Sequence, residues 1–204
     1  MSILAGTEIG MERIAREALV TLVNELNDAI DVEDAKWASL DAELANKLGL
    51  PFRPCKTNHV RKDNFYMGHR PSLIEADFDY YPNVAVMIAS AVKGADPLDQ
   101  LESNRLTMWI EAMAVDGPYT QKHKNFEREA EDLVNRKVQR MAEAIHAVLN
   151  SNRTFGGVIF EIEGISNASV SNCERRRNPG GSGDEFYWQM LRLEYTINKI
   201  SLYQ

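Results

Sequence analysis

The chain has 204 residues, of which 44% are hydrophobic, 8% aromatic and 26% charged. This composition is typical of a globular protein and excludes a disordered chain, a collagen-like chain and a small disulfide scaffold. Lys and Arg number 23 against 30 Asp and Glu, so the formal net charge is −7. Non-specific nucleic-acid binding depends on cations that displace phosphate counterions, and the chain as a whole lacks that charge balance.

The two cysteines, Cys55 and Cys173, lie far apart in the sequence and form no C-x-x-C motif. A reduced, intracellular setting is the simpler interpretation, with one long-range disulfide as the alternative. The first residues lack the basic segment and apolar run of a secretory signal. No apolar stretch approaches the roughly 18 residues needed to span a bilayer. We therefore expect a soluble cytosolic protein.

Residues 1–50 carry two helical patterns. Apolar residues recur in steps of three and four from Met11 to Ile30, which predicts an amphipathic helix. A second helix is predicted over about 32–48, with Trp37, Leu40, Leu44 and Leu48 on one side. Gly49 can adopt the left-handed conformation that ends a helix, and Pro51 prevents continuation. We expect this N-terminal helical pair to cover the other side of the sheet, opposite the long helix of the core, or to dock at an edge of the sheet.

Residues 51–72 contain three prolines and no periodic pattern, which predicts a long connecting loop. Connections of about 20 residues are uncommon in compact domains unless they are functional or disordered. The loop carries aromatic and basic side chains that make it a candidate contact surface: Phe65, Tyr66, His69 and Arg70.

Residues 73–204 are predicted to form an α+β core. Apolar residues alternate over about 84–88, 105–115, 158–162 and 185–202, which predicts strands, and a shorter strand is expected at 72–74. A long helix is expected over 124–149, with Lys137 and Arg140 on its solvent side. The predicted fold is an antiparallel or mixed sheet packed by one long helix, with the N-terminal helical pair completing one compact unit.

Between the last two strands, a glycine-rich tip carries the only run of basic residues. Arg175, Arg176 and Arg177 could contact nucleic acid or pair with acidic groups in an assembly, and the net charge favours the second alternative. Asp184 and Glu185 place opposite charge in the same loop. Phe186 and Trp188 follow on the far face of the last strand, either as an exposed contact patch or covered by the N-terminal helices.

No residue pattern predicts catalysis or a cofactor. Cys55 and His59 have the spacing of half a zinc site, but the second pair of ligands is missing. Nucleophile-elbow and phosphate-loop motifs are also missing from the sequence. Glu75, Asp77 and Asp79 alternate as metal ligands could, although a solvated strand edge or turn is the simpler interpretation.

Three segments resemble the neck and tail-terminator proteins of tailed bacteriophages. GHRPSLIEADFDYYPNVAVM matches their loop into a Tyr-Pro-x-Val-x-Val strand. LNSNRTFGGVIFEIEGISNASV matches a helix end followed by a Gly-Gly turn into a strand, and GDEFYWQMLRLEYTINKI is similar to their last strand. The resemblance covers roughly residues 65–202 and leaves the predicted N-terminal helices uncovered.

This resemblance implies a structural virion protein without an active site or cofactor. Such proteins form a homo-oligomeric ring, typically a hexamer, that caps the tail tube and joins it to the head connector after assembly in the host cytoplasm. The implied partners are the chain itself, the tail tube protein and the head-completion or connector protein. The tape measure protein and DNA passing through an acidic lumen are further candidates.

Under this interpretation the loop at 51–72 and the tip at 173–185 make the contacts between subunits or rings. The alternative is a small nucleic-acid-associated or regulatory binding module that uses the arginine tip. The predicted contact residues are Phe65, Tyr66, His69, Arg70, Arg175, Arg176, Arg177, Asp184, Glu185, Phe186 and Trp188.

Overall fold

The computed structural model describes residues 3–49, 54–68, 78–93, 103–119, 127–152, 160–177 and 184–200. Over these ranges the chain forms α1 (Ile3–Leu48), β1 (Phe65–Met67), β2 (Asn83–Lys93), β3 (Ser103–Tyr119), α2 (Glu127–Ser151), β4 (Phe160–Val170), β5 (Glu174–Arg177) and β6 (Glu185–Ile200). Two short 3-10 turns, η1 (Lys62–Asn64) and η3 (Phe78–Tyr80), flank β1 and β2. The predicted α+β class is confirmed. Neither helix has an 18-residue window apolar enough to cross a membrane within the described residues.

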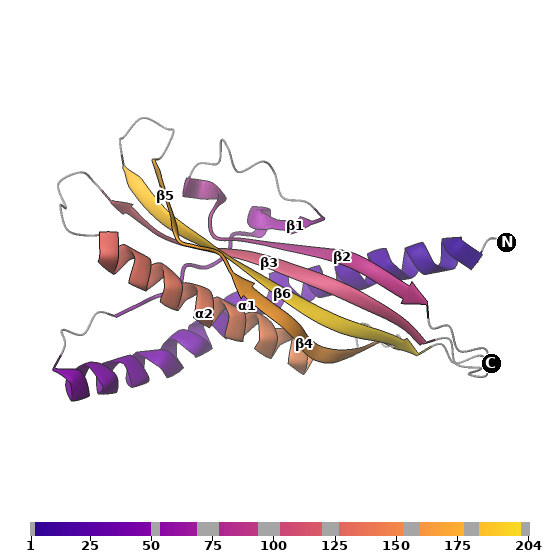
Figure 1. Ribbon diagram of the computed structural model, residues 1–204, viewed down its shortest axis with the longest axis horizontal. Coiled ribbons are helices and arrows are strands. Elements are labelled where there is room, and N and C mark those ends of the chain that lie inside the picture. The colour runs from indigo at the N-terminus through magenta and orange to yellow at the C-terminus, as the bar shows by residue number, and fades with distance from the viewer. Residues whose placement is uncertain are drawn as a thin grey trace.

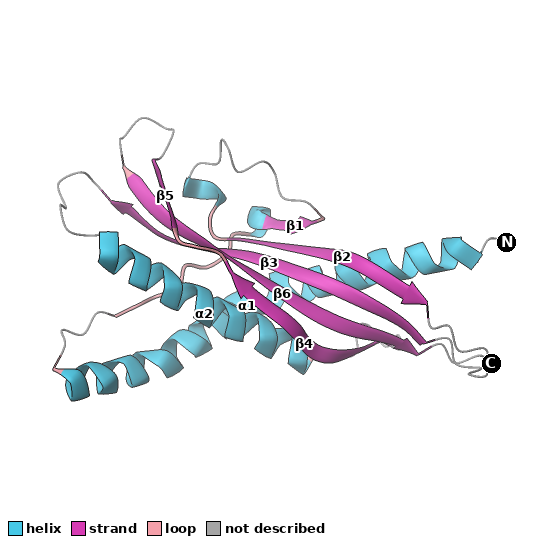
Figure 2. Cartoon of the chain, in the orientation of Figure 1, coloured by secondary structure: helices cyan, strands magenta, loops and turns pink. Residues whose placement is uncertain are grey.

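The six strands form one mixed sheet in the order β1-β2-β3-β6-β4, and β5 pairs with the first part of β6. β1 runs parallel to β2, and the other pairs are antiparallel. The long ladder between β3 and β6 extends from Ser103 opposite Ile200 to Tyr119 opposite Glu185. Both helices lie against the same face of this sheet (Figures 1 and 2). The expectation that the N-terminal helical segment covers the other side of the sheet is therefore wrong.

The core lies between that face and the helices, and the alternation predicted for the two central strands is confirmed. The buried inward side chains are Leu106, Met108, Ile110, Ala112 and Ala114 of β3, and Leu191, Leu193, Tyr195 and Ile197 of β6. The stripe of α1 that meets them includes Ile14, Leu22, Leu26 and Ile30. Full burial of each large apolar side chain contributes about 2 kcal/mol, so this stripe anchors α1 to the sheet.

The predicted N-terminal helical pair is a single helix of 46 residues. No glycine or proline interrupts the sequence near Ile30, and the inward stripe continues in helical register from Ile30 through Glu33 to Trp37, so nothing forces a break. The predicted end is confirmed: the helix stops at Leu48, and Gly49 has φ +65° and donates its N–H to the Asn46 carbonyl at 3.3 Å.

Two segments predicted as loops contain strands. Within 51–72, β1 forms because Phe65 can turn inward opposite Val84 while Tyr66 faces the other side of the sheet. In the arginine tip, β5 pairs with β6, from Glu174 opposite Trp188 to Arg177 opposite Glu185. Both strands are too short to show a periodic pattern in the sequence. The strand expected at 72–74 lies outside the described residues.

Gly117, in the irregular end of β3, provides a test of packing between strands. Its φ is +131°, and a Cβ added there would lie 3.0 Å from the Cβ of Phe186. We expect Gly117→Ala to lower the free energy of unfolding by about 3 kcal/mol in urea titrations, because backbone strain and overpacking add. Gly68→Ala is the matched control: φ is +84° with no atom near the added Cβ, so the loss should be about 1 kcal/mol. Equal losses in the two variants would contradict this packing.

Candidate contact surfaces

The predicted contact residues of the 51–72 segment are only partly accessible. Phe65 packs against the main core, and Tyr66 is half-buried on the opposite face. Burial raises the pKa of the Tyr66 hydroxyl, with smaller contributions from Tyr80 and Asp63. Phe65 therefore anchors β1 to the core, and neither side chain is a fully exposed contact residue. His69 and Arg70 lie outside the described residues.

Phe186 and Trp188 form a second core on the face of the sheet away from the helices, so the predicted exposed patch is wrong. The Phe186 ring lies 5.6 Å from Phe78 and 5.4 Å from Tyr81, measured between centroids, and the Trp188 ring stacks 6.2 Å from Tyr81. The cover comes from the segment that leads into β2, and the predicted alternative, cover by the N-terminal helices, is also wrong. Paired aromatic rings of this kind stabilise the fold locally, which explains their burial.

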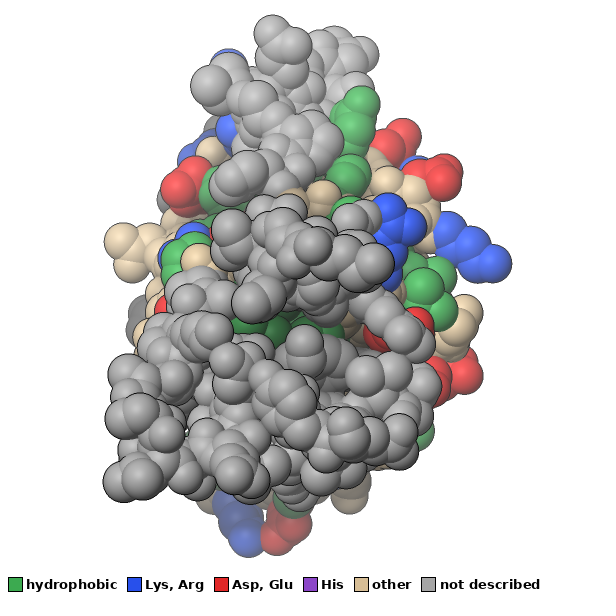
Figure 3. Space-filling model, turned by 90° about the vertical axis from the view of Figure 1, so that its right-hand side faces the viewer, with side chains coloured by type: hydrophobic (Ala, Val, Ile, Leu, Met, Phe, Trp, Pro, Cys, Tyr) green, Lys and Arg blue, Asp and Glu red, His purple; other side chains and the backbone are tan. Residues whose placement is uncertain are grey.

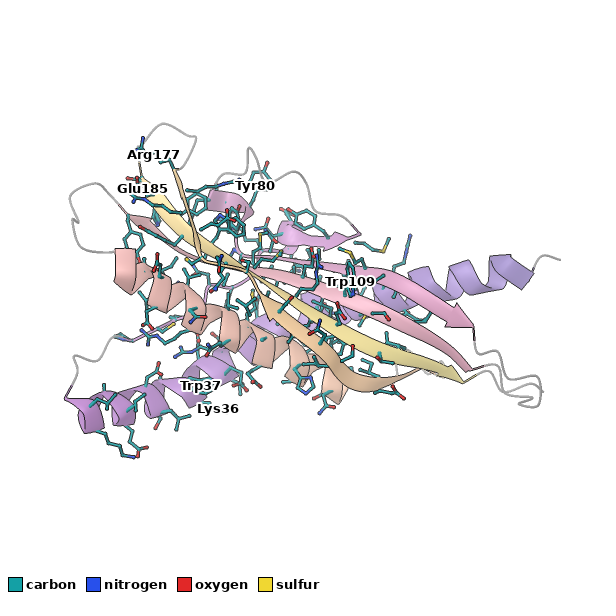
Figure 4. The ribbon with its side chains drawn as sticks, in the orientation of Figure 1. Lys36, Trp37, Tyr80, Trp109, Arg177 and Glu185 are labelled. Atoms are coloured by element: carbon teal, nitrogen blue, oxygen red, sulfur yellow. The ribbon has the colours of Figure 1, made fainter. Side chains whose placement is uncertain are left out.

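The arginine tip lies on β5, where an acidic residue of the neighbouring strand neutralises part of its charge. The Glu185 carboxylate accepts hydrogen bonds from Arg175 Nε at 2.7 Å and from Arg177 Nε at 3.3 Å. Figure 4 shows Arg177 and Glu185 together at this end of the sheet, with the exposed Tyr80 on the same end. Exposed pairs of this kind contribute less than about 1 kcal/mol, so an acidic partner can replace Glu185 at Arg175 and Arg177. Arg176, between them, is half-buried. Asp184, beside Glu185, is half-buried.

A buried ion-pair network joins α2 to α1, and no pattern in the sequence predicts it. Only 2% of the Arg140 side chain is exposed. Its guanidinium reaches Asp34 at 3.0 Å, Asp41 at 2.6 Å and the Cys55 carbonyl at 2.5 Å. Lys137 is buried as well, between Asp116 at 2.5 Å and Asn58 at 2.8 Å, so neither cation lies on the predicted solvent side.

This network fixes the direction of the second half of α1. Asp34 also accepts hydrogen bonds from the Thr57 N–H and hydroxyl at 2.7 and 2.8 Å, which ties the segment after α1 to the helix. Arg136 adds a second contact to Asp41 at 3.2 Å. The helix is therefore held to α2 by charges on one side after its apolar contacts with the sheet have ended.

The two cysteines are free, and burial keeps both protonated. Burial raises the pKa of Cys55 despite the nearby Arg140, and its thiol donates to the Leu133 carbonyl at 3.8 Å. Burial raises the pKa of Cys173 to about 11, and Glu131 adds to the effect. His59 pairs with Asp31 at 2.9 Å, so it does not share a partner with Cys55. Among the described residues no three His, Cys, Asp or Glu side chains gather as metal ligands would.

The outer face of the sheet carries a compact group of paired side chains. Arg192 donates to the Glu111 carboxylate at 2.8 Å, and its guanidinium stacks 4.5 Å above the ring centroid of Trp109 (Figure 4). The stacking and the ion pair fix the planar guanidinium in one orientation. These three side chains cover part of the face of the sheet that lies away from the helices.

At one end of the molecule, acidic and basic side chains are mixed on the surface. Figure 3 looks onto the end nearest the N-terminus, and the Lys and Arg side chains drawn there in blue alternate with Asp and Glu in red. A nucleic-acid-binding surface concentrates one sign of charge, and the coloured side chains of this end do not.

Among the described side chains of α1, an apolar stripe remains exposed in the second half of the helix. We call residues 32–48 the α1 overhang, because this half of the helix extends past the sheet (Figure 1). Leu40 is 46% exposed, Leu44 56% and Leu48 60%. The half-buried Trp37, labelled in Figure 4, begins this stripe. Aligned apolar side chains of this kind mark an interaction surface.

A second exposed surface lies on β4, at the edge of the sheet. Ile165 is 39% exposed and Val170 47%, and Ala168 between them is exposed too. Among the described strands, only β6 pairs with β4, so its outer edge is open. The run from Gly164 to Val170 carries no charged residue, although two register shifts interrupt the strand. An uncharged open edge is suited to contact with another chain.

Comparison of this chain with protein-family models and with curated proteins finds no match.

The ion-pair network can be tested by removing its central cation. We expect Arg140→Met to lower the free energy of unfolding by about 3–5 kcal/mol, because Asp34 loses its buried cation and Asp41 keeps only Arg136. Lys47→Met removes an exposed cation paired with Glu43 and should cost at most about 0.5 kcal/mol. Chemical denaturation of the two variants checks this difference, and a small loss for Arg140→Met would contradict it.

Proposed function

We propose that this chain is a structural virion protein of the phage neck: a ring-forming tail terminator that caps the tail tube and joins it to the head connector. The sequence resemblance over roughly 65–202 suggests the protein class. The single observation that carries the proposal is the pair of surfaces that one chain leaves exposed, the α1 overhang and the open side of β4.

Two exposed surfaces of different kinds suit a ring better than a two-fold dimer. A two-fold interface uses the same patch on both subunits, whereas a head-to-tail contact joins two different patches and closes into a ring when the rotation allows it. A stable contact of this type buries at least about 1,000 Å² in total. In this proposal the exposed helix half and the exposed strand edge are the two different patches of such a contact.

Contacts to the next ring are assigned to the end of the sheet formed by β5, β6 and η3. Arg175 and Arg177 are exposed there, as is Tyr80, and all three belong to segments held by the aromatic core around Phe186. A rigid base that presents arginines and an aromatic side chain is typical of a protein interface. In this proposal the arginines match acidic groups of the tube or connector.

Assembly is the direct test of this function. We expect light scattering of the purified chain to give one closed oligomer, and electron micrographs of a mixture with tail tube protein to show a ring at one end of each tube. The physical reason is that the ring binds the growing end of the tail tube and offers no second face to which further tube subunits can add. A chain that stays monomeric at all concentrations, with and without tail tube protein, would overturn the proposal.

The arginine tip separates this function from a nucleic-acid-binding module. We expect the triple variant Arg175→Ala, Arg176→Ala, Arg177→Ala to keep the fold and the oligomer and to lose docking to the neighbouring ring. Duplex DNA affinity, measured by fluorescence anisotropy over a salt series, should stay weak and similar in both proteins. A binding module would instead lose affinity, and its salt slope would fall by about one unit per lost phosphate contact.

A further inference from the structure

We propose that the two exposed surfaces are the two halves of one interface: the α1 overhang of one copy packs on the helix-side face of β4 in another copy, beside α2. The inference rests on the proposed function, because it supplies the head-to-tail contact that a ring requires.

The overhang carries the same stripe that forms the core of its own chain. Residues three and four apart share a helix face, so the line of Leu22, Leu26 and Ile30 continues through Glu33 and Trp37 to Leu40, Leu44 and Leu48. The stripe is buried up to Ile30, and its three last leucines are exposed. A surface built to lie on a sheet therefore extends beyond its own sheet.

The receiving face belongs to the sheet, and within the described residues no helix lies over it. Ile165, Ala168 and Val170 lie opposite Tyr195, Leu193 and Leu191, which all point to the helix side. Those three residues of β6 are buried beneath the helices, whereas their partners on β4 are exposed. Five strands abreast span about 24 Å, and two helices cover about 20 Å, so roughly one strand remains uncovered.

The place for an additional helix is bounded by α2. His146 of α2 stacks on Tyr195 at 6.3 Å between ring centroids, and Ile165 pairs with the same tyrosine from β4. Ala142, half-buried one turn earlier, lines the same side of α2. The exposed apolar face of β4 and the adjacent side of α2, which carries small and aromatic side chains, therefore form the two sides of the site. We call this site the step.

The overhang fits this step in length. Trp37 to Leu48 spans about 17 Å along a helix, and Ile165 to Val170 spans about 17 Å along a strand. The charged side chains of the overhang are paired within the chain: Lys36 with Glu33, Lys47 with Glu43, and Asp34 and Asp41 with Arg140. The overhang therefore brings no unpaired charge to the apolar side chains of β4.

Pairing of two overhangs with each other is the competing arrangement, and it explains less. It would cover Leu40, Leu44 and Leu48 but leave the β4 face exposed, and its two-fold symmetry would stop at a dimer. Packing on β4 covers both surfaces at once and repeats from copy to copy.

Charged substitutions on the two surfaces test the inference in the full-length chain. We expect Leu44→Glu and Ala168→Glu each to weaken self-association about 100-fold in sedimentation velocity experiments, because each buries a carboxylate in the contact. Val32→Glu, on the same half of α1 but off the stripe and already 65% exposed, is the matched control and should assemble as the parent does. Circular dichroism confirms that each variant is folded.

Mixing the two defective variants gives the sharper result. Leu44→Glu keeps an intact β4 face and Ala168→Glu keeps an intact overhang, so an equimolar mixture should form dimers with one good contact and nothing larger. A second readout is a disulfide between Leu44→Cys and Ala168→Cys chains mixed under oxidising conditions.

The outcomes separate this inference from the function on which it rests. If both glutamate variants assemble like the parent, or if Ala168→Glu has no effect while Leu44→Glu dissociates the oligomer, the interface is wrong and the ring function stands. If the parent chain is monomeric with tail tube protein present, the function and the interface both fail.

Discussion

The structure depends on one apolar stripe along α1. From Ile14 to Ile30 the stripe is buried against the sheet and α2, and beyond Ile30 it continues in register after the sheet has ended. A free apolar helix face in water is unfavourable, so natural chains keep one only where something else covers it. The apolar stripe that holds α1 to its own sheet therefore also provides, beyond Ile30, the surface for a second molecule.

Electrostatics determine where that free face points. Arg140, with Asp34 and Asp41 on either side of its guanidinium, holds the overhang to α2 through charges on one flank and leaves the leucines free. An overhang without this network would turn inward or fray, because a helix end held by few contacts gains little from remaining ordered. The buried ion pairs contribute little net stability, because the cost of desolvating the charges offsets their attraction. Their main effect is to fix the direction of the overhang.

The sequence predicted the long elements of the fold, in which the periodic pattern of apolar residues repeats several times. β3, β6 and α2 follow from alternating or helical patterns, and Gly49 marks the end of α1 correctly. Short strands such as β1 and β5 carry too few residues for a pattern, and the burial of Arg140 depends on partners 99 and 106 residues away. Trp188 was misassigned for the same reason, because its cover comes from Tyr81, distant in the sequence. The exposed face of β4 could not be predicted, since it depends on how far two helices reach across the sheet.

Amide hydrogen exchange at two protein concentrations measures whether the α1 overhang and the β4 face are covered by the same event. We expect that, on association, peptides over residues 37–48 and 164–170 become protected together, while a peptide within the largely buried segment 84–88 does not change. Protection that grows in one of the two regions alone, or exchange that is identical in the dilute and the associated protein, would contradict this expectation.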